Sequence, residues 1–331
     1  MLALKFMALR GLVVVGCGWI ARRHAVAARR LGVPLLVASR DLAKARAFAR
    51  EFGAADAFGA YADAARDPRA EAAVICTPHD RHCADTLAAL GAGLHVLVEK
   101  PIAPTVEEAD RMIAAARDAG RVLMVAENFH FMPAFRHVHG LVSSGALGGL
   151  RSLHLVARGY RQHHGWRLAA DAAGGGVLID GGIHYVHNLT WWGGEVRRVF
   201  ALRPPQTVKL GGEDAVELLA ELAGGVVGFV SNSLGALGAP RVQWSSVTGV
   251  DGTIFADNRG RFILSRGRGR MRLRLFRRDS RGHEAMLREF VDAVGSGRPP
   301  ETDGQSGRRD LAGGPAAYRS GAERRPVDLA C

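Results

Sequence analysis

Residues 13–24 read VVVGCGWIARRH, and this stretch decides the fold of the first part of the chain. A short apolar run is followed by Gly16, Gly18 and Ala21 in the spacing G-x-G-x-x-A, at the start of a helix-like segment. Glycine permits a tight turn and lets backbone N–H groups approach a pyrophosphate, whose charge a helix N-terminus favours. The motif alone also fits a plain glycine turn, but its place between a strand and a helix predicts a dinucleotide site.

Apolar runs and amphipathic segments alternate through the first 127 residues. Near-continuous apolar runs are typical of strands buried on both faces, and helical segments between them indicate parallel pairing. The runs are residues 11–15, 34–39, 72–76, 94–98 and 121–126, and the helical segments are 41–52, 80–90 and 105–119. The sequence therefore predicts an α/β domain with a doubly wound parallel Rossmann sheet over residues 1–127.

The pattern changes in residues 128–331. Strand-like runs follow one another without helices between them, which indicates an antiparallel sheet. Helical segments are expected at 133–144, 176–192 and 283–295, and strands near 150–160, 196–203, 214–222, 226–234, 241–249, 253–257 and 261–276. A Pro/Gly-rich tail closes the chain, and we expect a final helix in it to begin at Pro315, after Gly313 and Gly314. The sequence predicts an α+β domain for substrate binding and oligomerisation, with a large, mostly antiparallel sheet.

The composition indicates a globular protein of two domains. The chain has 331 residues, of which 48% are hydrophobic and 23% charged, and its formal net charge is +12. The arginines that carry this charge are scattered, and no basic cluster is interleaved with stacking aromatic residues, so we expect no nucleic-acid partner. No run is long enough to span a bilayer.

The cysteines of the chain are Cys17, Cys76, Cys83 and Cys331, which form neither a C-x-x-C pair nor a metal-binding spacing. Such usage is typical of a reducing compartment. The N-terminal residues resemble a signal peptide, but Arg10 interrupts their apolar part and no small-residue cleavage site follows. We therefore expect a cytoplasmic protein without a metal and without a membrane partner.

Ser39 and Arg40 determine which dinucleotide is expected. An acidic residue at the end of the second strand usually binds the adenosine ribose of NAD, whereas this chain reads VASRDLAK. A hydroxyl and a guanidinium suit a 2′-phosphate, so the sequence favours NADP over NAD. In the alternative interpretation, Arg40 is a solvated turn residue, Asp41 caps the next helix and Lys44 contributes nothing to binding.

Lys100 ends an apolar run in the stretch VLVEKP and is one of four lysines among 44 basic residues. The carboxyl ends of strands in a doubly wound sheet face the ligand crevice, so we expect its ammonium there. Pro101 restricts Lys100 to extended backbone angles and permits a cis peptide bond. A lysine can donate to a substrate oxygen and shift its pKa when desolvated, which an arginine cannot do. The alternative is an ordinary surface lysine after a strand.

A second chemical cluster lies in residues 174–192, GGGVLIDGGIHYVHNLTWW. As a helix this segment is apolar almost all round, yet Asp180, His184 and His187 fall at i, i+4 and i+7 on one face. A buried helix carries such groups only if they are paired or line a cavity. Asp180 can fix the tautomer of His184, the usual arrangement of a general acid or base. The alternatives are an internally satisfied Asp–His pair and a metal site.

Four stretches occur in the order and spacing of the Gfo/Idh/MocA oxidoreductases, the glucose-fructose oxidoreductase and inositol dehydrogenase group. They are GCGWIARRH, VICTPHDRHCADTLAALGAGLHVLVEKPIA, AENFHFMPAFR and GGGVLIDGGIHYVHNLTWW. The chain resembles this family over nearly the whole first domain and the key helix of the second. The resemblance implies an NAD(P)-dependent oxidoreductase that transfers hydride between nicotinamide and a hydroxyl or ketone carbon of a sugar, cyclitol or related polyol. It also implies a homodimer or homotetramer assembled through the C-terminal sheet.

The resemblance implies roles for individual residues as well. The family's catalytic lysine and its D-x-x-x-H pair fall on Lys100, Asp180 and His184. The expected cofactor contacts, in addition to Ser39 and Arg40, are Gly16, Gly18, Trp19, Ile20, Thr77, Pro78, His82, Glu99 and Lys100. The expected substrate contacts are Lys100, Trp166, Arg167, Asp180, His184 and His187. His79 and His187 depart from the Asn and Asp that the family often has, so the substrate of a known member is not transferred to this chain.

These residues predict a mechanism in which His184 takes a proton from a ring hydroxyl, Lys100 stabilises the same oxygen and Asp180 orients the imidazole. Lys100 and His184 must then reach one substrate oxygen. Two other functions stay open. One is glycoside cleavage assisted by a tightly held nicotinamide, and the other is a sugar sensor that binds dinucleotide without catalysis.

A run of alternating arginines lies in the stretch RGRGRMRLRLFRR. It predicts a strand whose arginine face is solvated or contacts another subunit, or which borders a subsite for a phosphorylated or nucleotide-linked substrate. The arginines are Arg268, Arg270, Arg272 and Arg274.

Overall fold

The apolar runs of the first part of the chain form a six-stranded parallel sheet. In the computed structural model, which describes residues 9–236 and 242–329, the strand order is β3-β2-β1-β4-β5-β6. The strands are β1 Leu12–Val15, β2 Leu35–Ala38, β3 Asp56–Phe58, β4 Ala72–Ile75, β5 His95–Val98 and β6 Leu123–Val125. β1, β2 and β4 are buried along their whole length, as expected for a parallel sheet covered on both faces. The predicted Rossmann fold is confirmed.

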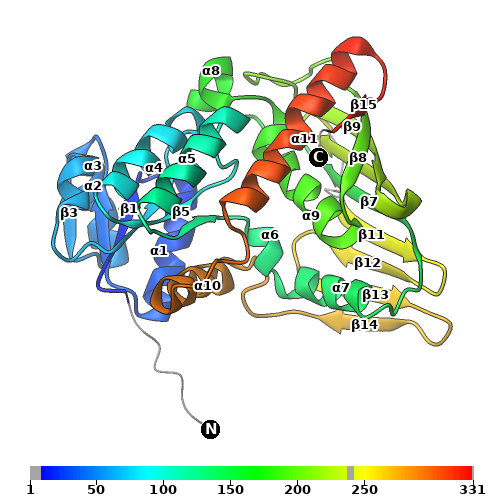
Figure 1. Ribbon diagram of the computed structural model, residues 1–331, viewed down its shortest axis with the longest axis horizontal. Coiled ribbons are helices and arrows are strands. Elements are labelled where there is room, and N and C mark those ends of the chain that lie inside the picture. Colours follow the sequence, from blue (N-terminus) through cyan, green and yellow to red (C-terminus); the bar gives the residue numbers. More distant parts are fainter. Residues whose placement is uncertain (1–8, 237–241, 330–331) are drawn as a thin grey trace, which may run out of the picture. The chain divides into compact units, whose positions relative to one another are not determined.

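Helices connect these strands and cover the sheet (Figure 1). They are α1 Trp19–Leu31, α2 Leu42–Phe52, α3 Tyr61–Ala65, the 3-10 turn His79–Arg81, α4 His82–Gly91 and α5 Val106–Asp118. The Asp41 carboxylate caps α2 by accepting a hydrogen bond from the Lys44 N–H group, and Thr105 caps α5 in the same way. β3 was not predicted from the sequence, because it is three residues long and only partly buried.

The contacts of the chain group it into two compact units. Within the described residues, unit 1 comprises 9–128 and 283–308, and unit 2 comprises 129–282 and 309–329. Unit 1 includes α10 (His283–Ser296), which packs against α1 and buries Leu287 and Phe290 completely. The predicted division at residue 127 assigns this segment to the second domain, whereas its contacts place it in unit 1.

Unit 2 is built on a nine-stranded sheet of order β14-β13-β12-β11-β7-β10-β9-β8-β15. The strands are β7 Leu150–Arg158, β8 Val196–Leu202, β9 Ala215–Leu222, β10 Val227–Ser233, β11 Val242–Gly249, β12 Thr253–Asp257, β13 Phe262–Arg266, β14 Arg272–Leu275 and β15 Val327–Asp328. β7 and β10 pair in parallel, and the other neighbours pair antiparallel. In β9, Leu218 and Ala220 are buried while Leu219 and Glu221 are exposed, so this sheet has a covered and an open face.

Helices of the second part of the chain cover one face of this sheet. They are α6 Asn128–Phe131, α7 Pro133–Ser143, α8 Ala170–Ala173, α9 Ile183–Gly193 and α11 Gly304–Glu323, with a π-helical turn at Leu178–Gly182 and 3-10 turns at Gly165–Leu168 and Ala223–Gly225. α7 contributes Val138 and α9 contributes Leu189 and Trp192 to a core that also contains Leu155 and Val230 of the sheet. The predicted α+β fold with a large, mostly antiparallel sheet is confirmed.

The final helix differs from the prediction. α11 begins at Gly304 and continues through Gly313, Gly314 and Pro315, so the prediction that it begins at Pro315 is wrong. A Cβ atom at Gly314 would lie 2.4 Å from the Cδ1 atom of Ile179. The glycine therefore allows α11 to approach the segment before α9, and the apparent helix stop is a packing feature.

Two further elements differ from expectation. The predicted strand 261–276 is a hairpin of β13 and β14, so Arg268 and Arg270 lie in the connection and not on one strand face with Arg272 and Arg274. The guanidinium of Arg268 pairs with Asp251 at 2.6 Å, which holds it at this turn. The helix expected over 176–192 begins with the π-helical turn, which changes the direction of its first side chains relative to a regular α-helix.

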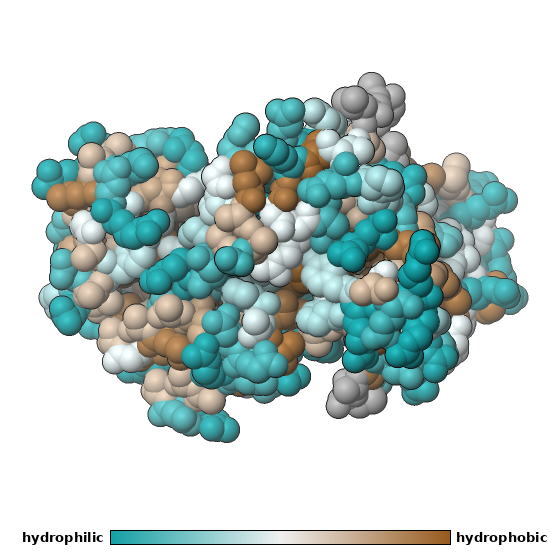
Figure 2. Space-filling view, turned by 90° about the horizontal axis from the view of Figure 1, so that it is seen from above, coloured by the Kyte–Doolittle hydropathy of each residue, from teal (hydrophilic) through white to brown (hydrophobic). Residues whose placement is uncertain are grey.

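The surface is predominantly hydrophilic on the face that Figure 2 shows, and its apolar residues form small patches. Part of the positive charge is compensated locally, because Arg69 pairs with Asp67 at 2.6 Å and Arg298 with Glu289 at 2.6 Å. Among the described residues, no helix combines the length and the apolar character needed to cross a membrane.

Candidate active site

The glycine turn between β1 and α1 has the geometry that a pyrophosphate needs. Gly16 has a φ of 99°, which other residues rarely adopt, and its N–H group donates to the Ala38 carbonyl oxygen at 2.8 Å. Gly18 is the N-cap of α1, and a Cβ atom there would meet nothing within 4 Å. The first turn of α1 contains no acidic residue, so its N–H groups are available to an anion.

Thr77 follows β4 beside this turn and supplies a second sign of a ligand. Its backbone N lies 3.6 Å from the position of a Cβ atom on Gly16, and its side-chain hydroxyl is buried without a partner among the described residues. Buried hydroxyl groups normally have a hydrogen-bond partner, so this one fits a group that a bound molecule supplies. The glycine turn and Thr77 together suit a dinucleotide.

Trp19 and His82, two other predicted cofactor contacts, differ in their exposure to solvent. Trp19 begins α1 and is 63% exposed, with the guanidinium of Arg23 lying 5.4 Å from its ring. His82 is completely buried, and its ring nitrogens lie 3.0 Å from the Thr77 carbonyl oxygen and 2.8 Å from the Pro101 carbonyl oxygen. His82 thus joins the ends of β4 and β5. Burial lowers the pKa of His82, although the hydrogen bonds to the two carbonyl groups oppose this shift.

Ser39 and Arg40 follow β2 directly, as the sequence predicted. Ser39 is 9% exposed and its hydroxyl oxygen accepts a hydrogen bond from the Asp41 N–H group at 3.3 Å, whereas Arg40 is exposed. The ammonium of Lys44 pairs with the Asp41 carboxylate at 3.6 Å. Asp41 is therefore the cap of α2, and Arg40 is an exposed cation directly after β2.

Lys100 follows β5 by two residues and lies beside a buried carboxylate. The Lys100–Pro101 peptide bond is cis, and the Lys100 N–H group lies 3.3 Å from Oε2 of Glu99. The other oxygen of Glu99 lies 2.7 Å from Nε2 of His24, whose side chain is completely buried on α1. Burial alone would raise the pKa of Glu99, but the hydrogen bond from His24 and the nearby positive charges outweigh it and lower the pKa.

In unit 2, Asp180 is held by an arginine. The Nε atom of Arg167 donates to one carboxylate oxygen of Asp180 at 2.7 Å, and a terminal nitrogen of Arg167 donates to the other at 3.3 Å. Arg167 also stacks over Trp166, with 4.2 Å between its guanidinium carbon and the ring centroid. The three residues therefore lie next to one another, and the bidentate contact fixes the carboxylate on the π-helical turn. Their contact with substrate stays a prediction.

His184 lies in the first turn of α9 and is covered by an aromatic ring. The rings of Phe129 and His184 are stacked, with centroids 4.2 Å apart and planes inclined by 8°. Phe129 itself packs edge-on against Phe135 and Tyr185. This stack fixes the orientation of the imidazole on one side.

His187 is more deeply placed than its neighbour. Its side chain is 2% exposed, Nδ1 lies 2.7 Å from the Asp310 carboxylate and Nε2 lies 3.0 Å from Nδ1 of His130. The prediction that His187 binds substrate stays a prediction, although both ring nitrogens have protein partners here. Sequence reasoning missed His24, Phe129, His130 and Asp310, and their only signal was polar or aromatic character inside apolar or family-like stretches.

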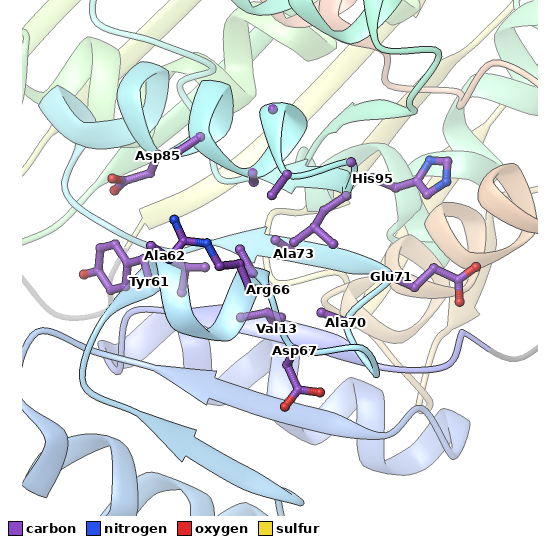
Figure 3. Close-up of a pocket in the computed structure, with 18 of the residues that line it drawn as sticks. Val13, Tyr61, Ala62, Arg66, Asp67, Ala70, Glu71, Ala73, Asp85 and His95 are labelled. Carbon is purple, nitrogen blue, oxygen red and sulfur yellow. The ribbon is translucent and has the colours of Figure 1, made fainter.

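A cavity of about 760 Å³ lies elsewhere in unit 1 (Figure 3). Val13 and Ala73 of the parallel sheet form part of its wall, and Tyr61 and Arg66 line it from the region of α3. α3 has five residues, three of which are alanines, so it covers the sheet face incompletely. None of the residues that line this cavity is among the predicted site residues.

Two family models match the chain in consecutive segments. The model described as "Oxidoreductase family, NAD-binding Rossmann fold" matches residues 10–127, and the "GFO/IDH/MocA C-terminal domain" matches residues 135–255. The chain belongs to the Gfo/Idh/MocA family. The glycine turn and Lys100 fall inside the first match, and Asp180 and His184 inside the second.

Curated members of the Gfo/Idh/MocA family resemble the chain to different extents. Trans-1,2-dihydrobenzene-1,2-diol dehydrogenase of Mus musculus is 34% identical over 208 residues, which cover 60% of this chain and 59% of the mouse protein. The match to the first relatives thus spans less than two thirds of their length. 1,5-anhydro-D-fructose reductase of Ensifer adhaerens is 28% identical and covers 96% of this chain and 97% of that protein.

Solved structures of Gfo/Idh/MocA proteins share the fold over the whole chain. Levoglucosan dehydrogenase in complex with NADH and levoglucosan superposes with a TM-score of 0.88 at 22% identity, covering 97% of this chain and 99% of that one. Aldose-aldose oxidoreductase from Caulobacter crescentus, complexed with glycerol, has a TM-score of 0.87 at 25% identity, covering 96% and 99%.

Proposed function

We propose that the chain is an oxidoreductase that transfers hydride between a nicotinamide dinucleotide and a hydroxyl or ketone carbon of a sugar, cyclitol or related polyol. The observation that carries this proposal is the presence of Lys100, Asp180 and His184 within the two family matches. Binding of a dinucleotide alone does not require these three groups, so catalysis is favoured over a sensor function.

The proposed substrate class is supported by the names of the relatives. The mouse relative is named for a cyclic diol, the Ensifer adhaerens relative for an anhydro sugar, and the structural neighbour was solved with levoglucosan. All three compounds are small and carry oxygen on ring carbons. We infer that this chain takes a ring compound with a secondary hydroxyl group.

NADP(H) is the proposed cofactor, ahead of NAD(H). Gly16, Gly18 and Thr77 would hold the pyrophosphate side of the molecule, and Arg40 with Ser39 would hold the 2′-phosphate. When bound, the nicotinamide ring supplies the hydride-accepting and hydride-donating chemistry.

The protein's own side chains would transfer the proton and stabilise the charge that develops on the substrate oxygen. In the oxidative direction, a ring nitrogen of His184 takes the hydroxyl proton, while Lys100 donates a hydrogen bond to the same oxygen and stabilises the developing negative charge. Asp180, fixed by Arg167, orients the imidazole. In the reductive direction, His184 gives its proton to the former ketone oxygen, which becomes the hydroxyl oxygen.

A cytoplasmic location and assembly as a homodimer or homotetramer remain part of the proposal. The open face of the nine-stranded sheet supports assembly, because Leu202, Leu219 and Val227 are between 43% and 48% exposed on neighbouring strands. Apolar residues gathered on one sheet face are typical of a subunit contact. Light scattering of the purified protein measures the oligomeric state, and a monomer at micromolar concentration would contradict this part of the proposal.

The function is tested by a substrate screen that follows nicotinamide absorbance. Sugars, cyclitols, anhydro sugars and cyclic diols are offered with NADP and with NAD in parallel, and ketone forms with the reduced cofactors. We expect turnover of at least one ring compound, faster with NADP(H). Release of sugar from a chromogenic glycoside without added cofactor would instead favour redox-assisted glycoside cleavage.

A further inference from the structure

Three polar side chains from three elements meet inside unit 2. Asp310 comes from α11, His187 from α9 and His130 from α6, and their exposed fractions are 5%, 2% and 8%. Oδ2 of Asp310 lies 2.7 Å from Nδ1 of His187, and Nε2 of His187 lies 3.0 Å from Nδ1 of His130. The three residues therefore form a continuous buried chain of hydrogen bonds.

The chemistry of these three side chains determines where the protons of their hydrogen bonds lie. A carboxylate only accepts hydrogen bonds, so Nδ1 of His187 carries a proton that it donates to Asp310. One further proton lies between Nε2 of His187 and Nδ1 of His130, because two ring nitrogens at this distance share a single hydrogen bond. Asp310 thus sets the tautomer of His187, and His187 in turn sets the ring orientation of His130.

Breaking the hydrogen bonds among Asp310, His187 and His130 would cost free energy of folding. The second carboxylate oxygen of Asp310 is buried, and the nearest guanidinium, that of Arg309, lies 3.8 Å away. Loss of one partner would leave buried polar groups without hydrogen bonds in a low-dielectric interior. Trp191 also holds the ring of His130 from its face, with centroids 4.1 Å apart. Both observations indicate that His130 has one fixed position.

The fixed position of His130 also determines the surroundings of His184. His130 directly follows Phe129, whose ring is stacked on the imidazole of His184. α6 has four residues, which is too short for a helix to be stable by its own backbone hydrogen bonds. Side-chain anchors must therefore hold α6 in place, and the hydrogen bond from His130 to His187 is one of them.

We propose that Asp310, His187 and His130 are positioning residues that hold Phe129 flat against the catalytic imidazole of His184. This inference rests on the proposed function in one respect, the role of His184 as the general acid and base. It assigns His187 a role different from the substrate contact that the sequence predicted.

The first experiment does not depend on activity. Carbethoxylation of His184 by diethyl pyrocarbonate is followed by peptide mass spectrometry in the wild-type protein and in Asp310→Asn. We expect His184 to react about fivefold faster or more in the variant, because the stacked ring no longer covers it. Ser320→Ala is the matched control. Ser320 is also buried on α11 and hydrogen-bonded to Ala201 and Arg325, but it does not take part in the hydrogen bonds of Asp310, His187 and His130.

A second variant keeps the proposal testable if Asp310→Asn does not fold. Phe129→Leu removes the stacked ring and leaves the hydrogen-bonded chain intact, so it should expose His184 to the same extent as Asp310→Asn. The double variant should react no faster than either single variant, because both changes act on the same contact. Additive effects, or a His184 rate in Asp310→Asn equal to that of Ser320→Ala, would overturn the proposal.

Kinetics separate positioning from substrate binding once a substrate is known. Asp310→Asn and His187→Gln should lower kcat about tenfold while KM for the substrate stays within about twofold. A rise in KM with unchanged kcat would instead show that His187 contacts substrate. If the screen finds no substrate, the modification rates still decide the positioning question, so the two proposals can fail independently.

Discussion

Arg40 is the residue on which the proposed preference for NADP depends. It is exposed directly after β2, where the neighbouring Lys44 is already paired with Asp41. Replacing Arg40 with Asp should raise KM for NADP about tenfold or more and lower KM for NAD, because a charge-assisted contact is lost and a ribose acceptor is gained. Initial rates with both cofactors measure this change. Arg46→Asp, which makes the same charge change on an exposed position of α2, should leave the ratio unaltered.

Lys100 and His184 carry the proposed chemistry. Lys100→Met and His184→Ala should each lower kcat about a hundredfold or more, while the dissociation constant for NADP(H) changes little. Stopped-flow turnover and fluorescence titration of the reduced cofactor measure the two quantities. Lys209→Met, on an exposed lysine, should retain wild-type rates. Unchanged turnover in either active-site variant would remove that residue from the mechanism.

Glu99 makes the stability of unit 1 dependent on pH. Its pKa in the folded chain lies below the ordinary value of 4.5, so the unfolded chain takes up a proton first as the pH falls. The free energy of unfolding should therefore decrease below about pH 4.5, and this contribution is fully present at neutral pH. Chemical denaturation at pH 3.5 to 7 should show a flatter pH profile for Glu99→Gln than for the wild type. Glu107→Gln, an exposed control, should retain the wild-type slope.

At this scale the sequence names candidate residues for chemistry, whose roles stay predictions, but it does not indicate which residues pair. Lys100, Asp180 and His184 stand out because charged groups interrupt apolar runs. The pairing of His187 with Asp310 joins residues 123 positions apart, and that of His24 with Glu99 joins residues 75 positions apart. Folding brings the members of each pair together, so no local sequence pattern could predict that they pair.

Among the elements, the π-helical turn at Leu178–Gly182 is the one that shapes the site. Gly176 precedes it, and a Cβ atom there would lie 2.1 Å from the Glu213 carbonyl oxygen and 2.3 Å from the Glu213 N atom. The Val177 N–H group donates to the same carbonyl oxygen at 2.7 Å. Close contact between two backbone segments therefore fixes the start of this turn.

Gly176→Ala should lower the free energy of unfolding by about 1–3 kcal/mol, because rigid backbone cannot move away from the new methyl group. It should also lower kcat by displacing the turn that carries Asp180. Urea denaturation and steady-state kinetics measure both effects. Gly140→Ala in α7 is the matched control, since nothing lies within 4 Å of its Cβ position, and it should raise stability by about 0.5–1 kcal/mol. Equal stability of the two variants would contradict the packing argument.

Strands and most helices were predictable from apolar runs and helical periodicity, whereas the π-helical turn and α11 were not. A segment such as GVLIDGGIH has the same apolar pattern in an α-helix and in a turn with one extra residue. The Gly-Gly-Pro stretch of α11 has the local pattern of a helix end, and only its contact with Ile179 shows why small residues stand there. Tertiary packing overrode local preference in both cases.

On the scale of the whole molecule, unit 1 is assembled from two separate parts of the chain. NADP should therefore slow amide hydrogen exchange in both parts, residues 9–128 and α10, by about tenfold or more, because a ligand stabilises the entire cooperative unit that binds it. Hydrogen–deuterium exchange followed by mass spectrometry measures this effect. Protection of residues 9–128 without protection of α10 would show that α10 does not unfold together with the rest of unit 1.

The length and composition of the chain predict two domains, and the change of pattern after residue 127 predicts a boundary there. The return of the chain to unit 1 was not predictable, because α10 is an ordinary amphipathic helix that could cover either sheet. Its assignment depends on its packing against α1, which exists only after folding.

The discontinuity of unit 1 has a consequence for how the protein is made. A ribosome releases residues 9–128 long before it has translated α10, so the face of α1 against which α10 packs is left bare while residues 129–282 of unit 2 are being synthesised. The nascent polypeptide should need a chaperone during that interval. A gene fragment ending at codon 128 should yield protein that aggregates until an α10 peptide is supplied.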